Sequence, residues 1–131
     1  MEELVTIMKT TEGNMRAFGT FHSWNDIADT DGTHISTANF KDITIDVEKR
    51  SVTFGAGVTY SMLVEALKTE KMAIENLPAM PNINVVGSVM TGASGSGIHN
   101  TPMSGYATAI AFVDPRGYPV RLRNDQDSEE F

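Results

Sequence analysis

The chain has 131 residues, no cysteine and a net charge of −7 at neutral pH. A single domain is therefore expected, disulfides and thiolate metal sites are excluded, and the negative charge disfavours nucleic acid or an anionic membrane as a partner. No apolar run reaches the roughly 20 residues of a membrane span and the acidic start does not resemble a secretion signal, so a cytoplasmic protein is expected.

The first third of the chain predicts one helix and two short strands. Apolar residues at helical spacing from Leu4 to Met8 follow two acidic residues, and Gly13-Asn14 ends this helix. Met15–Phe18 predicts a strand that turns at Gly19, and Thr33–Ser36 predicts a second strand.

The middle of the chain predicts a hairpin followed by a helix. Apolar and polar residues alternate through Ile43–Phe54, on both sides of a turn at Glu48-Lys49-Arg50. Thr59 is a typical N-cap residue for the helix that follows. Four apolar residues at spacing i, i+3, i+4 and i+7 form the stripe that this helix is expected to bury: Tyr60, Leu63, Val64 and Leu67.

The chain beyond Asn76 is rich in proline and glycine and only weakly periodic. Long irregular segments of this kind are usually functional or disordered. The apolar residues near Val85–Met90 favour order, with a short helix whose small residues let a flat ligand lie close. Ala107–Val113 and Tyr118–Leu122 then predict a second hairpin, joined by an Asp-Pro-Arg-Gly turn.

Motifs of known chemistry fit this sequence poorly. Gly55-Ala56-Gly57 resembles the opening of a dinucleotide-binding turn, but Tyr60 replaces the third glycine that close packing requires. Gly92 and Gly97 have the spacing of a phosphate-binding loop, yet Ile98-His99 stands where a lysine and a hydroxyl residue are needed. No histidine spacing supports a metal site, and no serine elbow supports a hydrolase.

His22 has two interpretations. In one it is an ordinary turn histidine whose ring bonds a nearby main-chain group. In the other, the turn at Gly19 presents main-chain N–H groups to an anion, and a neutral ring nitrogen of His22 attacks an electrophilic ligand. The residues alone leave both interpretations open.

Two separated segments carry a family resemblance. The first is Phe18 to Asp29, with the sequence FGTFHSWNDIAD, and the second is the run Gly87 to Gly97, GSVMTGASGSG. With Glu75–Pro81 between them, they are similar to the flavin-binding domain of the alditol (xylitol) oxidases, in the vanillyl-alcohol-oxidase-like family that holds FAD covalently through a histidine. The gulonolactone-type oxidases share the Gly-x-x-His-Ser pattern.

The resemblance implies an α+β fold, the FAD-binding domain of the covalent-flavin oxidase (PCMH-like) type, incomplete in this chain. Residues 1–75 are expected to form the first subdomain and residues 76–131 the start of the second. The cap domain that supplies most substrate-binding side chains in this family has no counterpart here, so an N-terminal fragment is expected.

The resemblance also assigns a cofactor and its contacts. FAD is expected, with its pyrophosphate in the loop from Ala17 to Ser23 and its isoalloxazine 8α-methyl group bonded to His22. Ser88 is expected near the flavin and in contact with the substrate, and no metal is expected. The expected cofactor-binding residues are Ala17, Phe18, Gly19, Thr20, Phe21, His22, Ser23, Ser88, Ala93, Ser96, Asn100, Thr101, Pro102 and Met103.

The activity that the resemblance implies is that of a full-length relative. Such a protein is expected to oxidise the CH–OH group of a polyol such as xylitol, or of a sugar lactone, by hydride transfer to the flavin, with oxygen as acceptor and hydrogen peroxide as product. A second hypothesis is a non-catalytic remnant that binds FAD weakly or serves only as an interaction fragment. A third is self-association through unpaired sheet edges.

Overall fold

The computed structural model describes residues 2–127 and 129, which form two compact units. The terminal unit combines the start of the chain up to Asn14 with the segment from Ala107 onward, and the central unit runs from Met15 to Tyr106. Both contain helices and strands, which confirms the expected mixed α+β content. Within the described residues, no helix has the length and apolar character needed to cross a membrane. The expected subdomain division near residue 75 stays a prediction.

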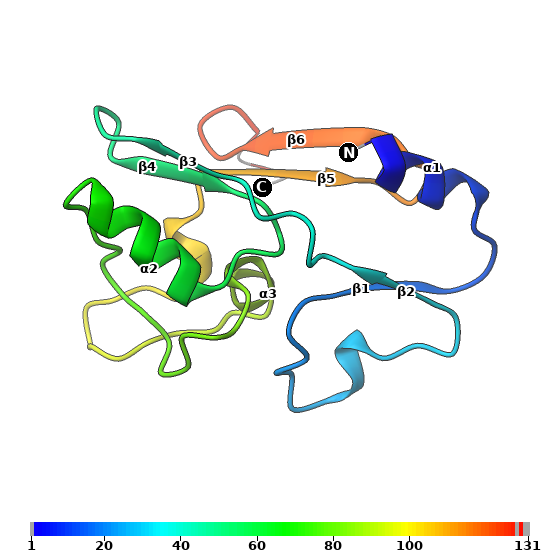
Figure 1. Ribbon diagram of the computed structural model, residues 1–131, viewed down its shortest axis with the longest axis horizontal. Coiled ribbons are helices and arrows are strands. Elements are labelled where there is room, and N and C mark those ends of the chain that lie inside the picture. The colour runs from blue at the N-terminus through cyan, green and yellow to red at the C-terminus, as the bar shows by residue number, and fades with distance from the viewer. Residues whose placement is uncertain (1, 128, 130–131) are drawn as a thin grey trace. The chain divides into compact units, whose positions relative to one another are not determined.

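The terminal unit consists of a helix and a β-hairpin (Figure 1). Its elements are α1 (Glu2–Thr10), β5 (Ala109–Val113) and β6 (Pro119–Arg123). β5 and β6 pair antiparallel, from Ala109 opposite Arg123 to Val113 opposite Pro119. The predicted helix and hairpin are confirmed, and the strand ends lie within two residues of the expected ones.

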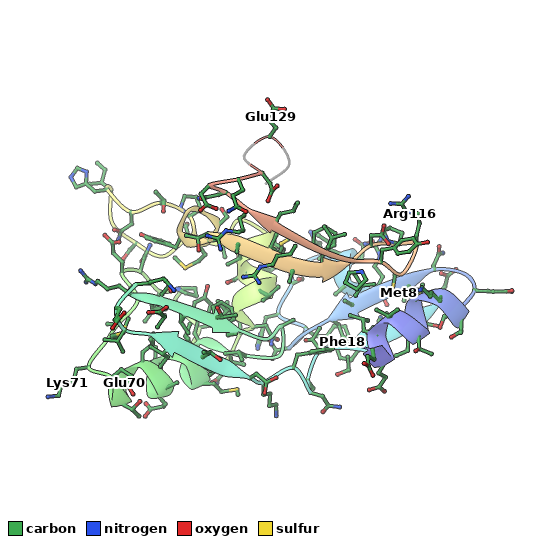
Figure 2. All side chains as sticks on the ribbon, turned by 90° about the horizontal axis from the view of Figure 1, so that it is seen from above. Met8, Phe18, Glu70, Lys71, Arg116 and Glu129 are labelled. Carbon is green, nitrogen blue, oxygen red and sulfur yellow. The ribbon has the colours of Figure 1, made fainter. Side chains whose placement is uncertain are left out.

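Asp114 organises the turn between β5 and β6. Its Oδ1 accepts hydrogen bonds from the main-chain N–H groups of Tyr118 at 2.8 Å and Arg116 at 2.9 Å, and its Oδ2 accepts one from Arg116 Nε at 3.0 Å. The hydrogen bond from Tyr118 is the main reason why the pKa of Asp114 lies below its ordinary value. Figure 2 shows Arg116 at this turn.

The central unit holds the remaining elements in chain order. They are β1 (Met15–Phe18), η1 (Asp26–Ala28), β2 (Thr33–Ser36), β3 (Ile43–Asp46), β4 (Ser51–Phe54), α2 (Tyr60–Thr69), α3 (Val85–Met90) and η2 (Met103–Tyr106). β3 and β4 form the predicted antiparallel hairpin, with Ile45 opposite Val52. Thr59 is the N-cap residue of α2, and its hydroxyl accepts a hydrogen bond from the N–H of Met62 at 3.4 Å.

The core of the central unit is built around α2. Its buried apolar residues are Val58, Tyr60, Leu63, Leu67, Val85 and Met103. Three of the four residues in the predicted stripe are therefore fully buried, and Val64 is half-buried. The apolar side chains of the β3–β4 hairpin pack against this core, and Figure 1 shows α2 running alongside the hairpin. In Figure 2, Glu70 and Lys71 mark the exposed C-terminal end of the helix.

β1 and β2 pair in parallel, a relationship that the sequence did not predict. The register runs from Met15 opposite Thr33 to Phe18 opposite Ser36. Parallel neighbours need a crossover of a dozen or more residues, and here it is the segment 19–32, called the crossover loop below, which contains η1. Most of the expected flavin-binding loop therefore lies in the connection between two paired strands.

Candidate functional site

The start of the crossover loop is anchored where Gly19 meets Asn84. A Cβ at residue 19 would overlap Oδ1 of Asn84, so only glycine allows this approach. Asn84 is 7% exposed and is held by donation from its Nδ2 to the carbonyl of Ala56 at 3.2 Å. Its Oδ1 has no hydrogen-bond partner among the residues that the structure describes. The loop therefore lies directly beside the residue that precedes α3.

The main-chain N–H groups of residues 19–23 are available to a ligand. None of the described residues accepts a hydrogen bond from them, and all five residues are exposed. Successive main-chain N–H groups in a turn are suited to binding an anion. The bend after β1 thus meets the first requirement of a phosphate-binding loop.

The imidazole of His22 is exposed. Within the described part of the chain, it has no hydrogen bond, ion pair or ring contact. The interpretation of His22 as a turn histidine requires a bond from its ring to nearby main chain, and that bond is missing here. The ring is therefore open to a ligand from outside the chain.

Phe21, the residue before His22, has an unusual backbone conformation. Its φ is +53°, in the left-handed region, which costs a non-glycine residue about 1–3 kcal/mol. Its ring stacks on Phe18 with a centroid distance of 4.4 Å and meets the ring of His34 edge-on at 5.9 Å. Phe18 and His34 also meet edge-on, at 5.6 Å. Aromatic pairs contribute about 0.5–1.5 kcal/mol each, so these contacts are large enough to offset the backbone strain.

Two basic side chains hold the later part of the crossover loop. Arg16 Nη1 donates to the carbonyl of Ile27 at 3.2 Å, and His34 Nε2 donates to the carbonyl of Ala28 at 3.1 Å. The same histidine nitrogen lies 3.9 Å from a carboxylate oxygen of Asp29. Sequence reasoning missed both basic residues, because the signal is the parallel register that places them opposite each other.

An open depression of about 470 Å³ lies beside this later part of the loop. It is lined by Arg16, Asn25, Asp26, Ile27, Asp29, Thr30 and Asp31. Three carboxylates against one guanidinium give it a negative potential, which opposes phosphate binding. The phosphate-binding candidate is therefore the bend at residues 19–23.

The glycine- and serine-rich run is anchored in the same way as the bend. Gly95 packs against the side chain of Asn76 and the carbonyl of Leu77, so that a Cβ would overlap both. The Nδ2 of Asn76 is a second buried polar atom that has no hydrogen-bond partner in the described part of the chain. No described residue accepts a hydrogen bond from the N–H groups of residues 94–99. The run begins within α3 and continues beyond Met90, whereas the bend touches the residue just before that helix.

The segment 93–103 is a closed loop. The N–H of Met103 donates to the carbonyl of Ala93 at 2.8 Å and joins its two ends. Inside it, Asn100 Nδ2 donates to the carbonyl of Ser96 at 2.7 Å. Ser96, Asn100, Thr101 and Pro102 are exposed and Ala93 is half-buried. These five expected cofactor-binding residues therefore lie on one continuous loop.

Two expected site residues lie inside the core. Ser88 is 5% exposed, and its hydroxyl bonds the hydroxyl of Tyr60 at 2.5 Å and the carbonyl of Val85 at 2.9 Å. Met103 is also 5% exposed and belongs to the core cluster. Both side chains serve packing in the described chain, and their expected contacts with cofactor or substrate stay predictions. The burial of Tyr60 raises the pKa of its phenol.

The Gly55-Ala56-Gly57 turn serves packing. The N–H of Gly55 donates to the carbonyl of Asp42 and that of Gly57 to the carbonyl of Phe40, each at 2.9 Å. A Cβ at either glycine would overlap main-chain carbonyls. Because these N–H groups are already bonded, the structure gives no support to the dinucleotide interpretation.

The residues of the bend fit FAD in three respects. Main-chain donors without an acceptor suit its diphosphate, which needs no lysine or arginine in such a setting. The missing side chain at Gly19 lets the main chain lie close to Asn84. An exposed imidazole follows three residues later. Together these features suit an elongated phosphate ligand with a reactive group near His22.

Comparisons with known proteins agree on one family. Residues 1–123 match the family model described as an FAD binding domain. The chain is 32% identical over 124 residues to an alditol oxidase of a Streptomyces species, covering 92% of this chain and 30% of that protein. It is 25% identical over 133 residues to the L-gulonolactone oxidase of Bos taurus, covering all of this chain and 30% of the relative.

A plant relative extends the comparison. The mitochondrial L-galactono-1,4-lactone dehydrogenase of Arabidopsis thaliana is 28% identical over 91 residues, covering 70% of this chain and 15% of that protein. The chain thus spans less than a third of the length of each of these three relatives.

Proposed function

Since the chain belongs to the FAD binding domain family, we propose that its bend at residues 19–23 holds the diphosphate of FAD and that His22 carries a covalent bond to the flavin. FAD is the cofactor of this family. One observation carries the proposal: an exposed imidazole without a protein partner lies within a run of main-chain N–H groups that have no acceptor among the described residues. The fold type proposed with it is the PCMH-like FAD-binding domain.

Two segments of the chain hold the cofactor in this proposal. The N–H groups from Gly19 to Ser23 bind the diphosphate, and Ala17 and Phe18 lead the main chain into the bend. After α3 in the chain, the closed loop presents its own residues to the cofactor: Ala93, Ser96, Asn100, Thr101 and Pro102. A contact with Met103 requires this buried side chain to leave the core. Gly19 and Gly95 fix the two segments against the body of the unit.

His22 forms the covalent bond in this proposal. A nitrogen of its ring would be joined to the 8α carbon of the flavin, in place of one methyl hydrogen and of the imidazole hydrogen. Dioxygen would accept the two protons and the electron pair, giving hydrogen peroxide. When bound, FAD supplies a ring that accepts a hydride from a CH–OH carbon. Among the described residues His22 has no hydrogen bond, ion pair or ring contact, which supports this role because no such interaction has to break.

The proposed activity of the protein is the oxidation of a CH–OH group in a polyol or sugar lactone, with oxygen as acceptor. Two relatives named alditol oxidase and L-gulonolactone oxidase support this substrate class. Ser88 is proposed to lie near the substrate, which requires its bond with Tyr60 to open. A cytoplasmic location is part of the same proposal.

Denaturing mass spectrometry of the chain expressed with FAD tests the covalent bond. The wild-type chain is expected to gain the mass of one FAD less two hydrogens, His22→Ala is expected to gain none, and the exposed His99→Ala serves as the matched control that keeps the adduct. A yellow wild-type protein without an adduct would refute the bond and leave non-covalent binding. A colourless protein that still melts cooperatively would instead support the non-catalytic remnant.

A further inference from the structure

We propose that His34 is a positioning residue for His22 and acts through Phe21. This inference rests on the proposed function, in which His22 carries the flavin. His34 touches neither the cofactor nor the reacting atoms. It holds the residue before His22 in the one backbone conformation that presents the imidazole at the surface of the bend.

The backbone at Phe21 sets the direction in which His22 leaves the loop. Phe21 has a φ of +53°, a conformation that a bulky residue keeps only when its surroundings hold it. Phe21 is 57% exposed as a whole residue, so burial alone does not hold it. Its ring contacts are the stack on Phe18 and the edge of His34. Loss of these contacts lets Phe21 return to negative φ, and His22 then points elsewhere.

His34 is itself fixed at two points. Its main chain belongs to β2 and pairs with Arg16 of β1. Its Nε2 donates to the carbonyl of Ala28, which stops the ring from turning away. The same imidazole therefore contacts Phe21 near the start of the crossover loop and Ala28 near its end. One side chain therefore links two separate points of the crossover loop.

The experiment uses Trp24, the chain's single tryptophan, as a reporter in the same loop. Trp24 is 97% exposed and stands two residues after His22, so its fluorescence anisotropy follows the local motion of the bend. His34→Ala removes both the ring and the hydrogen bond. His34→Phe keeps the ring edge and removes the hydrogen bond to Ala28 together with the 3.9 Å approach to Asp29. His99→Ala is the matched control. The second readout is the initial rate of FAD adduct formation on the apo chain.

If the ring contact holds the bend, the variants should differ in a clear order in Trp24 motion and in the rate of adduct formation. His34→Ala is expected to increase the amplitude of fast Trp24 motion and to slow adduct formation about tenfold or more, since a small misplacement of a reacting group is costly. His34→Phe and His99→Ala are expected to stay within about threefold of wild type. If His34→Ala fails to fold by circular dichroism, Phe21→Gly replaces it, because glycine adopts positive φ freely and removes the same ring contact.

The two readouts separate this inference from the proposed function. An adduct on the wild-type chain that forms at the same rate in His34→Ala, with unchanged anisotropy, overturns the role of His34. If the wild-type chain forms no adduct, the covalent role of His22 fails and the inference about flavin attachment fails with it. The anisotropy then tests the remaining claim, that His34 holds the bend through Phe21. A bend that is as rigid in His34→Ala as in wild type refutes that claim as well.

Discussion

Arg16 and His34 stand opposite each other across the parallel pair of β1 and β2, and their side chains bond consecutive carbonyls of the crossover loop. Arg16 donates to Ile27 and His34 to Ala28. Because cross-strand partners share a face of the sheet, both side chains reach the same short helix, η1. The cross-strand pair of Arg16 and His34 therefore holds η1 in place through two neighbouring hydrogen bonds.

This sharing predicts coupling between the two residues. Arg16→Ala and His34→Ala are each expected to lower the free energy of unfolding by about 0.5–1.5 kcal/mol. The double variant is expected to differ from the sum by about 0.5 kcal/mol or more, because once one bond is lost η1 moves and weakens the other. Urea unfolding of the four proteins measures this, and strict additivity would contradict the shared role.

Gly19 is expected to tolerate no side chain. Gly19→Ala places a Cβ on Oδ1 of Asn84 and should cost about 1–3 kcal/mol of unfolding free energy through overpacking. The matched variant is Gly87→Ala in α3, where the nearest atom to a new Cβ is 3.8 Å away. That substitution is expected to stabilise the chain by about 0.5–1 kcal/mol, since alanine suits a helix better. Equal effects of the two substitutions, measured by thermal and urea unfolding, would argue against the anchor.

The buried pair of Tyr60 and Ser88 predicts unequal effects of two conservative substitutions. Ser88→Ala leaves the phenol of Tyr60 buried without its partner and should cost about 1–3 kcal/mol. Tyr60→Phe removes the phenol hydroxyl itself, and Ser88 keeps its bond to the carbonyl of Val85, so a smaller loss of unfolding free energy is expected. Urea unfolding provides the comparison. A larger loss in Tyr60→Phe would show that the tyrosine hydroxyl contributes more than its bond to Ser88.

Alkaline pH is expected to destabilise the chain through the same tyrosine. Burial raises the pKa of Tyr60 above the ordinary value of 10.0, so the unfolded chain loses this proton first. The contribution to stability is complete below pH 10.0 and is lost as the pH rises through the raised pKa. Unfolding free energies measured across this range should fall less steeply in Tyr60→Phe. Parallel curves for the two proteins would exclude Tyr60 as the source.

Acid is expected to destabilise the β5–β6 turn through Asp114. Hydrogen bonds from Tyr118 and Arg116 hold the pKa of this carboxyl below the ordinary value of 3.8, so the unfolded chain binds the proton more readily. The contribution to stability is present above pH 3.8 and is lost as the pH falls through the lowered pKa. Asp114→Asn keeps an oxygen acceptor but cannot ionise. Its unfolding free energy should depend less on pH than that of wild type in this range, and an unchanged slope would contradict the prediction.

The parts of the fold that local patterns encode were predictable from the sequence. The alternation through Ile43–Phe54 and the spacing of Tyr60, Leu63 and Leu67 each reflect one face of one element, so the hairpin and α2 are confirmed with nearly the expected ends. Such patterns need no knowledge of the rest of the chain. Because the hairpin and α2 were predicted correctly from such patterns, the elements that form the core of the central unit are encoded by local sequence.

The contacts between distant segments were not predictable in the same way. The parallel pairing of β1 with β2 depends on how the crossover loop folds back, and two strands of four residues carry no register signal. The positive φ at Phe21 is a tertiary effect, since local rules reserve that conformation for glycine. Likewise, the resemblance predicts a ligand contact for Ser88, whereas the chain itself bonds that hydroxyl to Tyr60. The sequence motif predicts the candidate site loop, but it does not predict the residues that hold this loop in place.

The closed loop from Ala93 to Met103 has a consequence for how the sequence can vary. One main-chain hydrogen bond joins its ends, and Met103 ties one end to the core. Insertions or deletions between these ends change the length of the exposed arc without displacing the helices beneath it, because lengthening a surface arc costs little free energy. Differences in length among related chains should therefore gather around the exposed Ile98, where they change the arc while the scaffold stays the same.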